Sequence, residues 1–294
     1  MLSDQIKEAM SLHNEDLVTF IEEYEDEPCL QTKAVRVGER IKRILFDMTR
    51  SVVVTSATLS SNGRFDYVAS EFGLDRPATV IAETPFDFSS QTLLVVPAGL
   101  PNPNDDDYRL AVAECLHEII ELAGGRTLAL FTSYRNLDAA HERLSATCGY
   151  RVLRQGDMPR TALIEEFRKD VSSVLLGTDS FWAGADVPGE ALSCVVIDRL
   201  PFPSPEDPVV DAISSTDKRW FHRYALPRAI IAFRQGFGRL IRRRTDRGVV
   251  VVLDQRIVTK GYGRAFLGSL PGGGGLRTRH LPNIAKFLGT KSGE

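Results

Sequence analysis

Thr127-Leu-Ala-Leu-Phe131-Thr-Ser-Tyr134 is the stretch of sequence that decides the fold. It opens with a short apolar run, and apolar positions at helical spacing follow it over residues 134–147. A continuous apolar run that leads into an amphipathic segment predicts a buried strand followed by a helix.

The same alternation recurs along most of the chain. Helices are predicted near 105–123, 134–147, 160–168 and 227–243. The apolar runs that predict strands are Ser51–Thr55, Thr92–Val96, Thr127–Phe131, Arg151–Leu153, Ser173–Leu176, Cys194–Ile197 and Gly248–Leu253. Continuous apolar strands that alternate with helices predict an α/β fold, a doubly wound and mostly parallel sheet with helices on both faces. Ligands of such sheets bind beyond the carboxyl ends of the strands, so the residues after each run are the candidate site.

The two ends of the chain have a different pattern. Residues 1–50 are predicted to be helical, because apolar residues approximate helical spacing from Ile6 to Ile21 and again from Val37 to Leu45. The four prolines of Pro201–Pro208 predict an extended loop. The run Pro271–Gly275 is predicted to mark the end of the compact domain.

Charge is unevenly distributed on a chain whose net charge is −3. Residues 15–27 carry seven acidic residues and no Lys or Arg, whereas residues 228–247 carry seven arginines and a single acid, Asp246. A local basic cluster predicts an anionic ligand such as phosphate. No apolar run approaches the roughly 20 residues of a membrane helix, and the first thirty residues lack a signal pattern, so a cytoplasmic protein is expected. The four cysteines predict separate reduced thiols rather than a metal site.

The segment Gln235-Gly-Phe-Gly-Arg239-Leu-Ile-Arg242 lies on the predicted helix 227–243. Spacings of four and seven residues would place Gln235, Arg239 and Arg242 on one helical face. Guanidinium groups match phosphate oxygens and keep their charge, which suits stabilisation of a transferring phosphoryl group. Gly236 and Gly238 disfavour helix, and close backbone approach is the expected reason for them. The alternative is an ordinary solvated basic face.

Three further segments follow apolar runs. Residues 176–189 contain three glycines, two aspartates and the pair Phe181-Trp182, which are suited to contact a nucleotide or to stack on bases; core packing of the aromatics is the alternative. Thr55-Ser-Ala-Thr-Leu59 and Phe131-Thr-Ser-Tyr134 place hydroxyls at strand ends. These hydroxyls either bind charged neighbours or simply cap the next helix.

Taken together and in this order, these segments resemble the motifs of superfamily 2 DNA helicases of the DinG/XPD-like branch. Thr55–Leu59 is similar to motif III, Phe131–Ser133 to motif IV, Gly177–Gly189 to motif V and Gln235–Arg242 to motif VI. The resemblance runs from about residue 50 to residue 270. It implies two RecA-like domains with ATP between them and single-stranded DNA as partner.

The resemblance also implies roles for individual residues. Gln235, Arg239 and Arg242 would be catalytic and would bind ATP. The further ATP contacts would be Gly184 and Asp186. Nucleic acid would be bound by Thr132, Ser133, Thr178, Asp179 and Trp182. Ser56 and Thr58 would couple hydrolysis to DNA, and no residue of this chain would bind a metal.

The sequence lacks other parts of the family pattern. It contains no Walker A sequence, G-x-x-x-x-G-K-[ST], no convincing D-E-A-H box and no set of four iron–sulfur cysteines. The chain therefore resembles a helicase cut just upstream of residue 1. ATP and Mg²⁺ would be held mainly by a first RecA-like domain in cis or in trans. An iron–sulfur cluster would be possible only in that part.

The resemblance implies a division of the chain. Residues 1–50 would be a helical remnant of the family's arch-like region, 51–85 the last strand and helix of the first RecA-like domain, 86–270 the second RecA-like domain and 271–294 a glycine-rich tail. The chain alone is expected to be inactive as an ATPase. The alternatives are a non-catalytic nucleic-acid-binding or regulatory module that lost its ATPase half, and a nucleotide-dependent transferase on the same sheet.

Overall fold

The computed structural model describes residues 16–24, 27–182 and 192–290, and the chain divides into two compact units. The first unit comprises Met1–Ile81 and Phe202–Ile231, and the second comprises Ala82–Pro201 and Ala232–Glu294. The boundary between Ile231 and Ala232 falls inside one helix, α10 (Leu226–Phe237).

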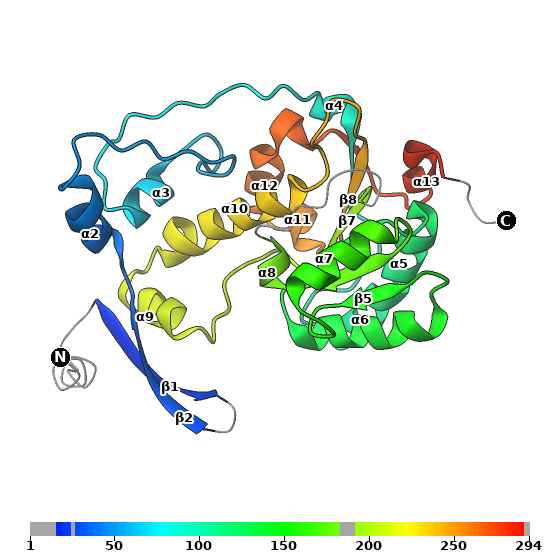
Figure 1. Cartoon of the computed structure of the whole chain (residues 1–294), viewed down its shortest axis with the longest axis horizontal. Coiled ribbons are helices and arrows are strands. Elements are labelled where there is room, and N and C mark those ends of the chain that lie inside the picture. Colours follow the sequence, from blue (N-terminus) through cyan, green and yellow to red (C-terminus); the bar gives the residue numbers. More distant parts are fainter. Residues whose placement is uncertain (1–15, 25–26, 183–191, 291–294) are drawn as a thin grey trace. The chain divides into compact units, whose positions relative to one another are not determined.

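A parallel sheet forms the centre of the second unit (Figure 1). Its described strands lie in the order β5 (Val152–Arg154), β6 (Val174–Gly177), β4 (Thr127–Leu130), β7 (Cys194–Ile197), β8 (Gly248–Val252), β3 (Thr92–Val95) and β9 (Leu276–Thr278). Six of the seven predicted apolar runs are therefore strands of one sheet. The inner strands β4, β6, β7 and β8 are buried at every position, so they read as continuous apolar runs.

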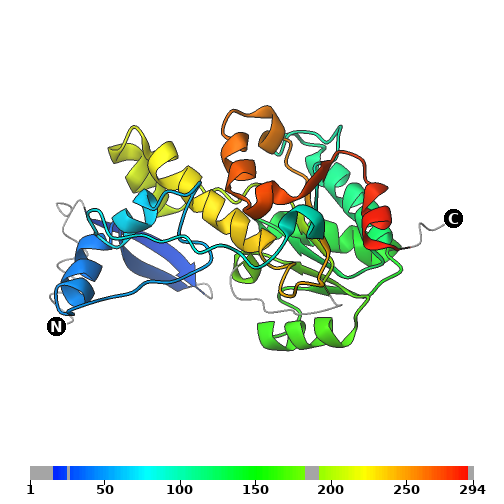
Figure 2. The same ribbon diagram turned by 90° about the horizontal axis from the view of Figure 1, so that it is seen from above.

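Helices cover both faces of this sheet, as predicted (Figure 2). One face packs Ala129 and Phe131 in a common core with α5 (Tyr108–Ala123), α6 (Tyr134–Thr147) and α13 (Asn283–Leu288). Side chains alternate along a strand, so Leu130 points to the other face, where α10 crosses it. The remaining helical segments of the unit are α4 (Phe88–Gln91), α7 (Arg160–Lys169), α8 (Asp179–Trp182), α11 (Arg256–Thr259), α12 (Gly263–Ser269) and η3 (Pro271–Gly274).

The first unit combines a β-hairpin with short helices. The hairpin pairs β1 (Leu17–Tyr24) with β2 (Glu27–Ala34) and contacts α9 (Pro208–Thr216) (Figure 1). The other elements are α2 (Gly38–Ile41), η1 (Lys42–Phe46), α3 (Asp66–Glu71), η2 (Phe221–Ala225) and the first half of α10. Arg228 of α10 donates a hydrogen bond to the Tyr224 hydroxyl, and Tyr224 packs edge-on against Tyr67 of α3.

The helical prediction for residues 1–50 is wrong over 17–34, where the chain forms the hairpin, and is confirmed over 38–46. Val18, Thr19, Phe20 and Ile21 are β-branched or aromatic, and such residues favour strands. Cross-strand contacts add to this preference, because Thr19 and Thr32 share a hydrogen bond of 3.2 Å and the Lys33 ammonium lies 4.8 Å from the centre of the Phe20 ring.

The strand prediction for Ser51–Thr55 is also wrong in this structure. The segment forms no strand, and the Val53 side chain is 86% exposed. A strand needs a neighbouring strand to take up its backbone N–H and C=O groups, and none of the described strands pairs with this segment.

The glycine run does not end the compact domain. Gly272–Gly275 all have positive φ, and a Cβ on Gly275 would lie 2.1 Å from the hydroxyl oxygen of Thr92. The glycines thus let the backbone pass close to β3 and place β9 beside that strand. Farther on, Ile284 and Phe287 of α13 join the core, so residues 276–288 belong to the folded unit. Among the described residues, no helix is both long and apolar enough to span a bilayer.

Candidate functional site at the carboxyl ends of the strands

Polar side chains from three neighbouring strands meet just beyond the carboxyl ends of β4, β5 and β6. Gln155, which follows β5, accepts hydrogen bonds at Oε1 from the backbone N–H of Thr178 (2.7 Å) and from its hydroxyl (3.1 Å). The Gln155 side-chain amide donates to the Tyr134 hydroxyl at 2.6 Å. The chain of contacts therefore links the first residue of α6 to the first residue after β6.

After β4, a hydroxyl residue caps the next helix, which was the alternative to ligand binding for this segment. Ser133 is the N-cap of α6, and its Oγ accepts the backbone N–H of Asn136 at 3.3 Å. Thr132 is half-buried at the same strand end. Capping uses Ser133 Oγ as an acceptor and leaves its hydroxyl hydrogen to another partner.

The aromatic pair after β6 packs in the core. Phe181 is fully buried and Trp182 is 3% exposed, with the indole N–H donating to the carbonyl oxygen of Phe131 at 3.3 Å. The alternative of core packing therefore holds for both aromatics in this structure, and the nucleic-acid contact of Trp182 stays a prediction. Asp179 begins α8, but its side chain lies outside what the structure describes, as do Gly184 and Asp186.

Gly236 explains how α10 approaches the sheet so closely. A Cβ at this position would lie 3.1 Å from the Trp182 ring and 3.2 Å from Leu130. The expectation of close backbone approach is confirmed for Gly236. Gly238 is exposed, and the atoms nearest a Cβ there are carbonyl oxygens of Arg234 and Gln235.

The prediction that Gln235, Arg239 and Arg242 share one helical face is wrong. The helix ends at Phe237, and the amides of Arg239 and Leu240 bond three residues back, to Gly236 and Phe237, in a tightened turn. Helix-disfavouring glycines on both sides of Phe237 account for the early end. Gln235 is thus on the helix, Arg239 is in the turn and Arg242 is in the loop before β8.

Arg239 nevertheless reaches the strand-end site. It is half-buried, and its Nη2 donates to the carbonyl oxygen of Trp182 at 2.6 Å. Trp182 in turn bonds Phe131, so the turn after α10, α8 and the end of β4 form one connected set. The structure therefore brings together three of the four sequence segments, whereas Ser56 and Thr58 belong to the first unit.

The loop that carries Arg242 has a fixed backbone. Asp246 accepts the backbone N–H groups of Arg242 (2.9 Å) and Arg243 (2.7 Å). The Gln91 side chain donates to the carbonyl oxygens of Arg243, Arg244 and Asp246. Residues 242–244 are exposed, so this loop presents consecutive guanidinium side chains on a backbone that is held from both sides.

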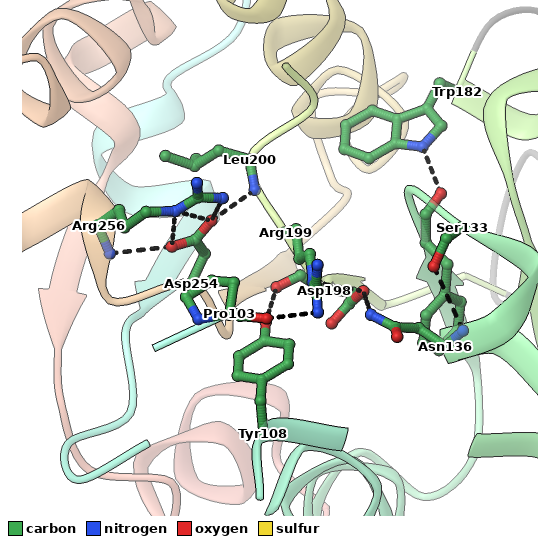
Figure 3. A network of polar contacts seen from close by, with 11 residues as sticks. Pro103, Tyr108, Ser133, Asn136, Trp182, Asp198, Arg199, Leu200, Asp254 and Arg256 are labelled. Carbon is green, nitrogen blue, oxygen red and sulfur yellow. Dashed lines mark hydrogen bonds and ion pairs between the residues drawn. The ribbon is translucent and has the colours of Figure 1, made fainter. Parts of the chain in front are cut away.

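A second polar network joins the ends of β4, β7 and β8 (Figure 3). Asp198, directly after β7, is 1% exposed, and its Oδ2 accepts a 2.9 Å bond from the Asn136 side chain. The Tyr108 hydroxyl donates to the Asp198 carbonyl oxygen at 2.7 Å, and the Arg199 guanidinium lies 4.9 Å from the centre of the Tyr108 ring. Burial raises the pKa of the Asp198 carboxyl to about 6, against the lowering effects of the Asn136 bond and of Arg199.

Asp254 holds the neighbouring strand end. Its Oδ2 accepts the backbone N–H of Leu200 at 2.9 Å, and both carboxylate oxygens accept bonds of 2.6–3.0 Å from the Arg256 guanidinium (Figure 3). Gln255 adds a bond to the Pro97 carbonyl oxygen beyond β3. These contacts tie the segment after β7 to the segments after β8 and β3.

Gln155, Asp198 and Asp254 are the polar residues that sequence reasoning did not single out as site residues. Each follows the apolar run of a predicted strand within two residues, so the rule that directed attention to strand ends would have found them. Within the ranges that the structure describes, there is no group of three or more His, Cys, Asp or Glu able to hold a metal ion. The four cysteines are free thiols.

Residues 116–273 match the family model described as Helicase C-terminal domain. The chain is 39% identical over 245 residues to the ATP-dependent DNA helicase YoaA of Haemophilus influenzae and 44% identical over 231 residues to the ATP-dependent helicase DinG of Mycobacterium tuberculosis. These alignments cover 81% and 75% of this chain but only 38% and 34% of the relatives, so the chain spans less than half of their length.

A solved structure of an XPD helicase shares the fold. It superposes with a TM-score of 0.68 and 16% sequence identity, over 93% of this chain and 49% of that chain.

Proposed function

Because the chain belongs to the helicase C-terminal domain family, in the DinG/XPD-like branch of superfamily 2, we propose that it is the second motor domain of an ATP-dependent DNA helicase. In this proposal the strand-end site binds single-stranded DNA and supplies arginines to ATP hydrolysis. The intact motor would also contain a first RecA-like domain with a Walker A loop, a sequence that these 294 residues do not contain.

One observation carries the proposal. The hydrogen bond from Arg239 Nη2 to the Trp182 carbonyl, followed by the bond from the Trp182 indole to Phe131, joins the motif VI segment to the motif V and motif IV segments. A shift of Arg239 toward a phosphate would therefore be transmitted to the backbone after β6 and β4. A connected set of hydrogen-bonded and packed groups of this kind can carry coupling between a nucleotide and a DNA strand.

The two arginines that would contact the nucleotide are held in place by different parts of the second unit. Arg239 is braced by the Trp182 carbonyl, and Arg242 extends from the loop whose backbone Asp246 holds. Two guanidiniums can spread over the oxygens of a γ-phosphoryl group and stabilise its charge in the transition state, an effect of roughly 10³–10⁵ in rate where arginine fingers have been measured. Gln235, Gly184 and Asp186 complete the proposed ATP contacts.

The donors in this chain fit the phosphates of ATP better than they fit its metal. When bound with ATP, Mg²⁺ would neutralise the negative charge that develops on the phosphates. Since the described residues offer no acidic cluster for it, we propose that Mg²⁺ is held mainly by the first domain. The residues of this chain would orient the phosphates and exclude water around them.

The domain assignment follows from the same proposal. Residues 51–85 would complete the first RecA-like domain, and residues 86–270, extended by β9 and α13, would form the second. The segment Ser51–Thr55 would then gain strand neighbours from the first domain, and Ser56 and Thr58 would lie where hydrolysis is coupled to DNA.

Reconstitution tests this function. The 294-residue chain should show no DNA-stimulated ATP hydrolysis by itself, and turnover should arise when a RecA-like domain with a Walker A loop is supplied in trans. Arg242→Ala and Arg239→Ala should abolish that turnover, whereas Arg243→Ala, an exposed arginine in the same loop, should retain it. Robust turnover by the chain alone, or full turnover with Arg242→Ala, would contradict the assignment.

The non-catalytic alternative predicts a different result. A nucleic-acid-binding module that lost its ATPase half would bind oligonucleotides, but no partner domain would restore hydrolysis. Nucleotide-binding measurements without DNA distinguish the helicase domain and the non-catalytic module from a nucleotide-dependent transferase. Only the transferase should bind ATP tightly by itself.

A further inference from the structure

The amide of Gln155 fixes the direction of every hydrogen bond in the chain that joins Thr178 to Tyr134. A backbone N–H can only donate, so the Gln155 atom 2.7 Å from the Thr178 nitrogen must be the carbonyl oxygen. The other end of the amide is then the NH₂ group, which must donate to the Tyr134 hydroxyl 2.6 Å away. The hydroxyl of Tyr134 is thus an acceptor toward the protein.

This direction leaves the hydroxyl hydrogen of Tyr134 available to a ligand. A phenol has one hydrogen to donate, and a phenol that accepts a bond from Gln155 does not use that hydrogen inward. Tyr134 is 57% exposed, so the donor is at the surface. Thr178 has the opposite situation, since it is 6% exposed and its hydroxyl donates inward to Gln155.

The surroundings keep Gln155 in place. Gln155 lies in the turn that follows β5, and this turn is closed by a hydrogen bond from the Asp157 amide to the Arg154 carbonyl. Gly156 in the same turn has a φ of +107°, a conformation that favours glycine. Arg154 forms ion pairs with Asp157 at 2.8 Å and with Asp138 of α6 at 3.3 Å. The turn after β5 is therefore tied to the same helix that begins with Tyr134.

Guanidinium groups lie near this donor along α6 and at the start of α7, together with carboxylates. Arg135 is the next residue of α6 and is exposed, whereas Arg154 is shared between Asp138, one helical turn farther on, and Asp157. Arg160, at the start of α7, lies 5.5 Å from the centre of the Phe181 ring, which follows Thr178 by three residues. An acceptor with negative charge and several oxygens, such as a phosphodiester, matches this set.

We propose that the Tyr134 hydroxyl donates a hydrogen bond to a backbone phosphate of the bound nucleic-acid strand, and that Gln155 is the positioning residue that turns this donor outward. The proposal rests on the proposed nucleic-acid-binding function and deepens it. In this proposal Tyr134, and not the buried Thr178, contacts the phosphate directly. Thr178 instead holds the Gln155 side chain in place through its backbone N–H and its hydroxyl.

Binding of a fluorescein-labelled oligothymidylate to the 294-residue chain at low salt, followed by anisotropy, tests the proposal. Tyr134→Phe removes only the hydroxyl and should weaken binding about tenfold, the effect of losing one hydrogen bond to a charged oxygen. Gln155→Glu still accepts from Thr178 but can no longer donate, so Tyr134 must donate inward to the carboxylate. It should weaken binding at least as much.

The double variant isolates the positioning role. The added charge of Gln155→Glu repels phosphate in either background, but its effect through Tyr134 disappears once the hydroxyl is gone. Gln155→Glu should therefore cost less affinity in the Tyr134→Phe background than in the unaltered chain. Tyr150→Phe, a half-buried tyrosine two residues before β5 and thus at the opposite end of the sheet, is the matched control and should bind normally.

The outcomes separate this inference from the function on which it rests. If the unaltered chain binds the oligonucleotide and Tyr134→Phe binds it equally well, the phosphate contact is wrong while the nucleic-acid-binding function stands. Equal losses from Gln155→Glu in both backgrounds would overturn the positioning role of Gln155. If the unaltered chain does not bind at all, both the inference and the proposed nucleic-acid interface are overturned.

Discussion

Two segments of this chain have almost the same sequence pattern and different structures. Ser51-Val-Val-Val-Thr-Ser-Ala-Thr58 and Thr127-Leu-Ala-Leu-Phe-Thr-Ser-Tyr134 each consist of an apolar run that ends in hydroxyl residues. Residues 127–130 form β4 between β6 and β7, and Ser133 caps α6. Residues 51–55 have no strand assignment, and the Ser56 hydroxyl accepts the amide of Thr58 two residues later, in a local turn.

An apolar run in the sequence shows only that its side chains need to be buried, and not which elements will bury them. The run in β4 meets that requirement because strands lie on both sides and helices cover both faces. Val53 and Val54 of the other run are 86% and 40% exposed. Strand formation is a property of the neighbours as much as of the segment itself.

The largest expected difference between the two segments is in stability. Leu128 is fully buried, so Leu128→Ala should lower the free energy of unfolding by about 2–5 kcal/mol through lost burial and a residual cavity. Val53→Ala, at an exposed position, should change it by less than about 0.5 kcal/mol. Denaturant unfolding of both variants measures this. Equal effects would mean that the two segments are buried alike in solution.

A second difference concerns the buried carboxyl next to β4. Since the pKa of Asp198 is about 6 in the folded chain and 3.8 is its ordinary value, the folded state binds the extra proton between these values and stability falls as pH rises through this window. Asp198→Asn removes this dependence. The variant should gain stability relative to the unaltered chain from pH 4 to pH 8, by at most roughly 3 kcal/mol.

Thermal melting at several pH values checks the titration of Asp198. Asp106→Asn controls for the loss of one exposed carboxyl. A constant difference between Asp198→Asn and the unaltered chain across this range would show that Asp198 does not titrate in the folded state as described.

The smallest expected difference is between the two serines that end the runs. Ser133→Ala removes an N-cap and should cost about 1 kcal/mol. Ser56→Ala removes a hydrogen bond within an exposed turn and should change the melting temperature little. Loss of stability from Ser56→Ala as large as that from Ser133→Ala would indicate that Ser56 has a structural role which this conformation does not show.

Much of the fold could be predicted from the sequence because the apolar strands of the second unit are buried by other elements of the same unit. The six apolar runs from Thr92 to Leu253 became strands of one parallel sheet, and α6 begins at Tyr134 and ends at Thr147 as expected. The failures have specific causes. The hairpin at 17–34 arises from cross-strand pairs that a helical spacing does not reveal, and Gly272–Gly275 serve a close approach to β3.

The sequence could predict which candidate residues lie at the strand ends, but only part of the contacts that they make there. The strand-end rule located Ser133, Thr178 and Trp182, whereas Trp182 is buried and Gln155 provides the link between strands. Helical spacing failed for Arg239 and Arg242, because the helix ends between the two glycines. Side-chain direction and the end of a helix depend on packing against other elements, which periodicity in one segment does not report.

Hydrogen–deuterium exchange tests most directly whether this chain is one half of a two-domain motor. The measurement compares the chain alone with the chain mixed with a Walker A-containing RecA-like domain and a non-hydrolysable ATP analogue. Amides of residues 52–55 should become protected as the run gains strand neighbours, and those of residues 239–243 should slow as the arginine loop meets the phosphates. Unchanged exchange in both segments, while the partner domain is bound to nucleotide, would contradict the account.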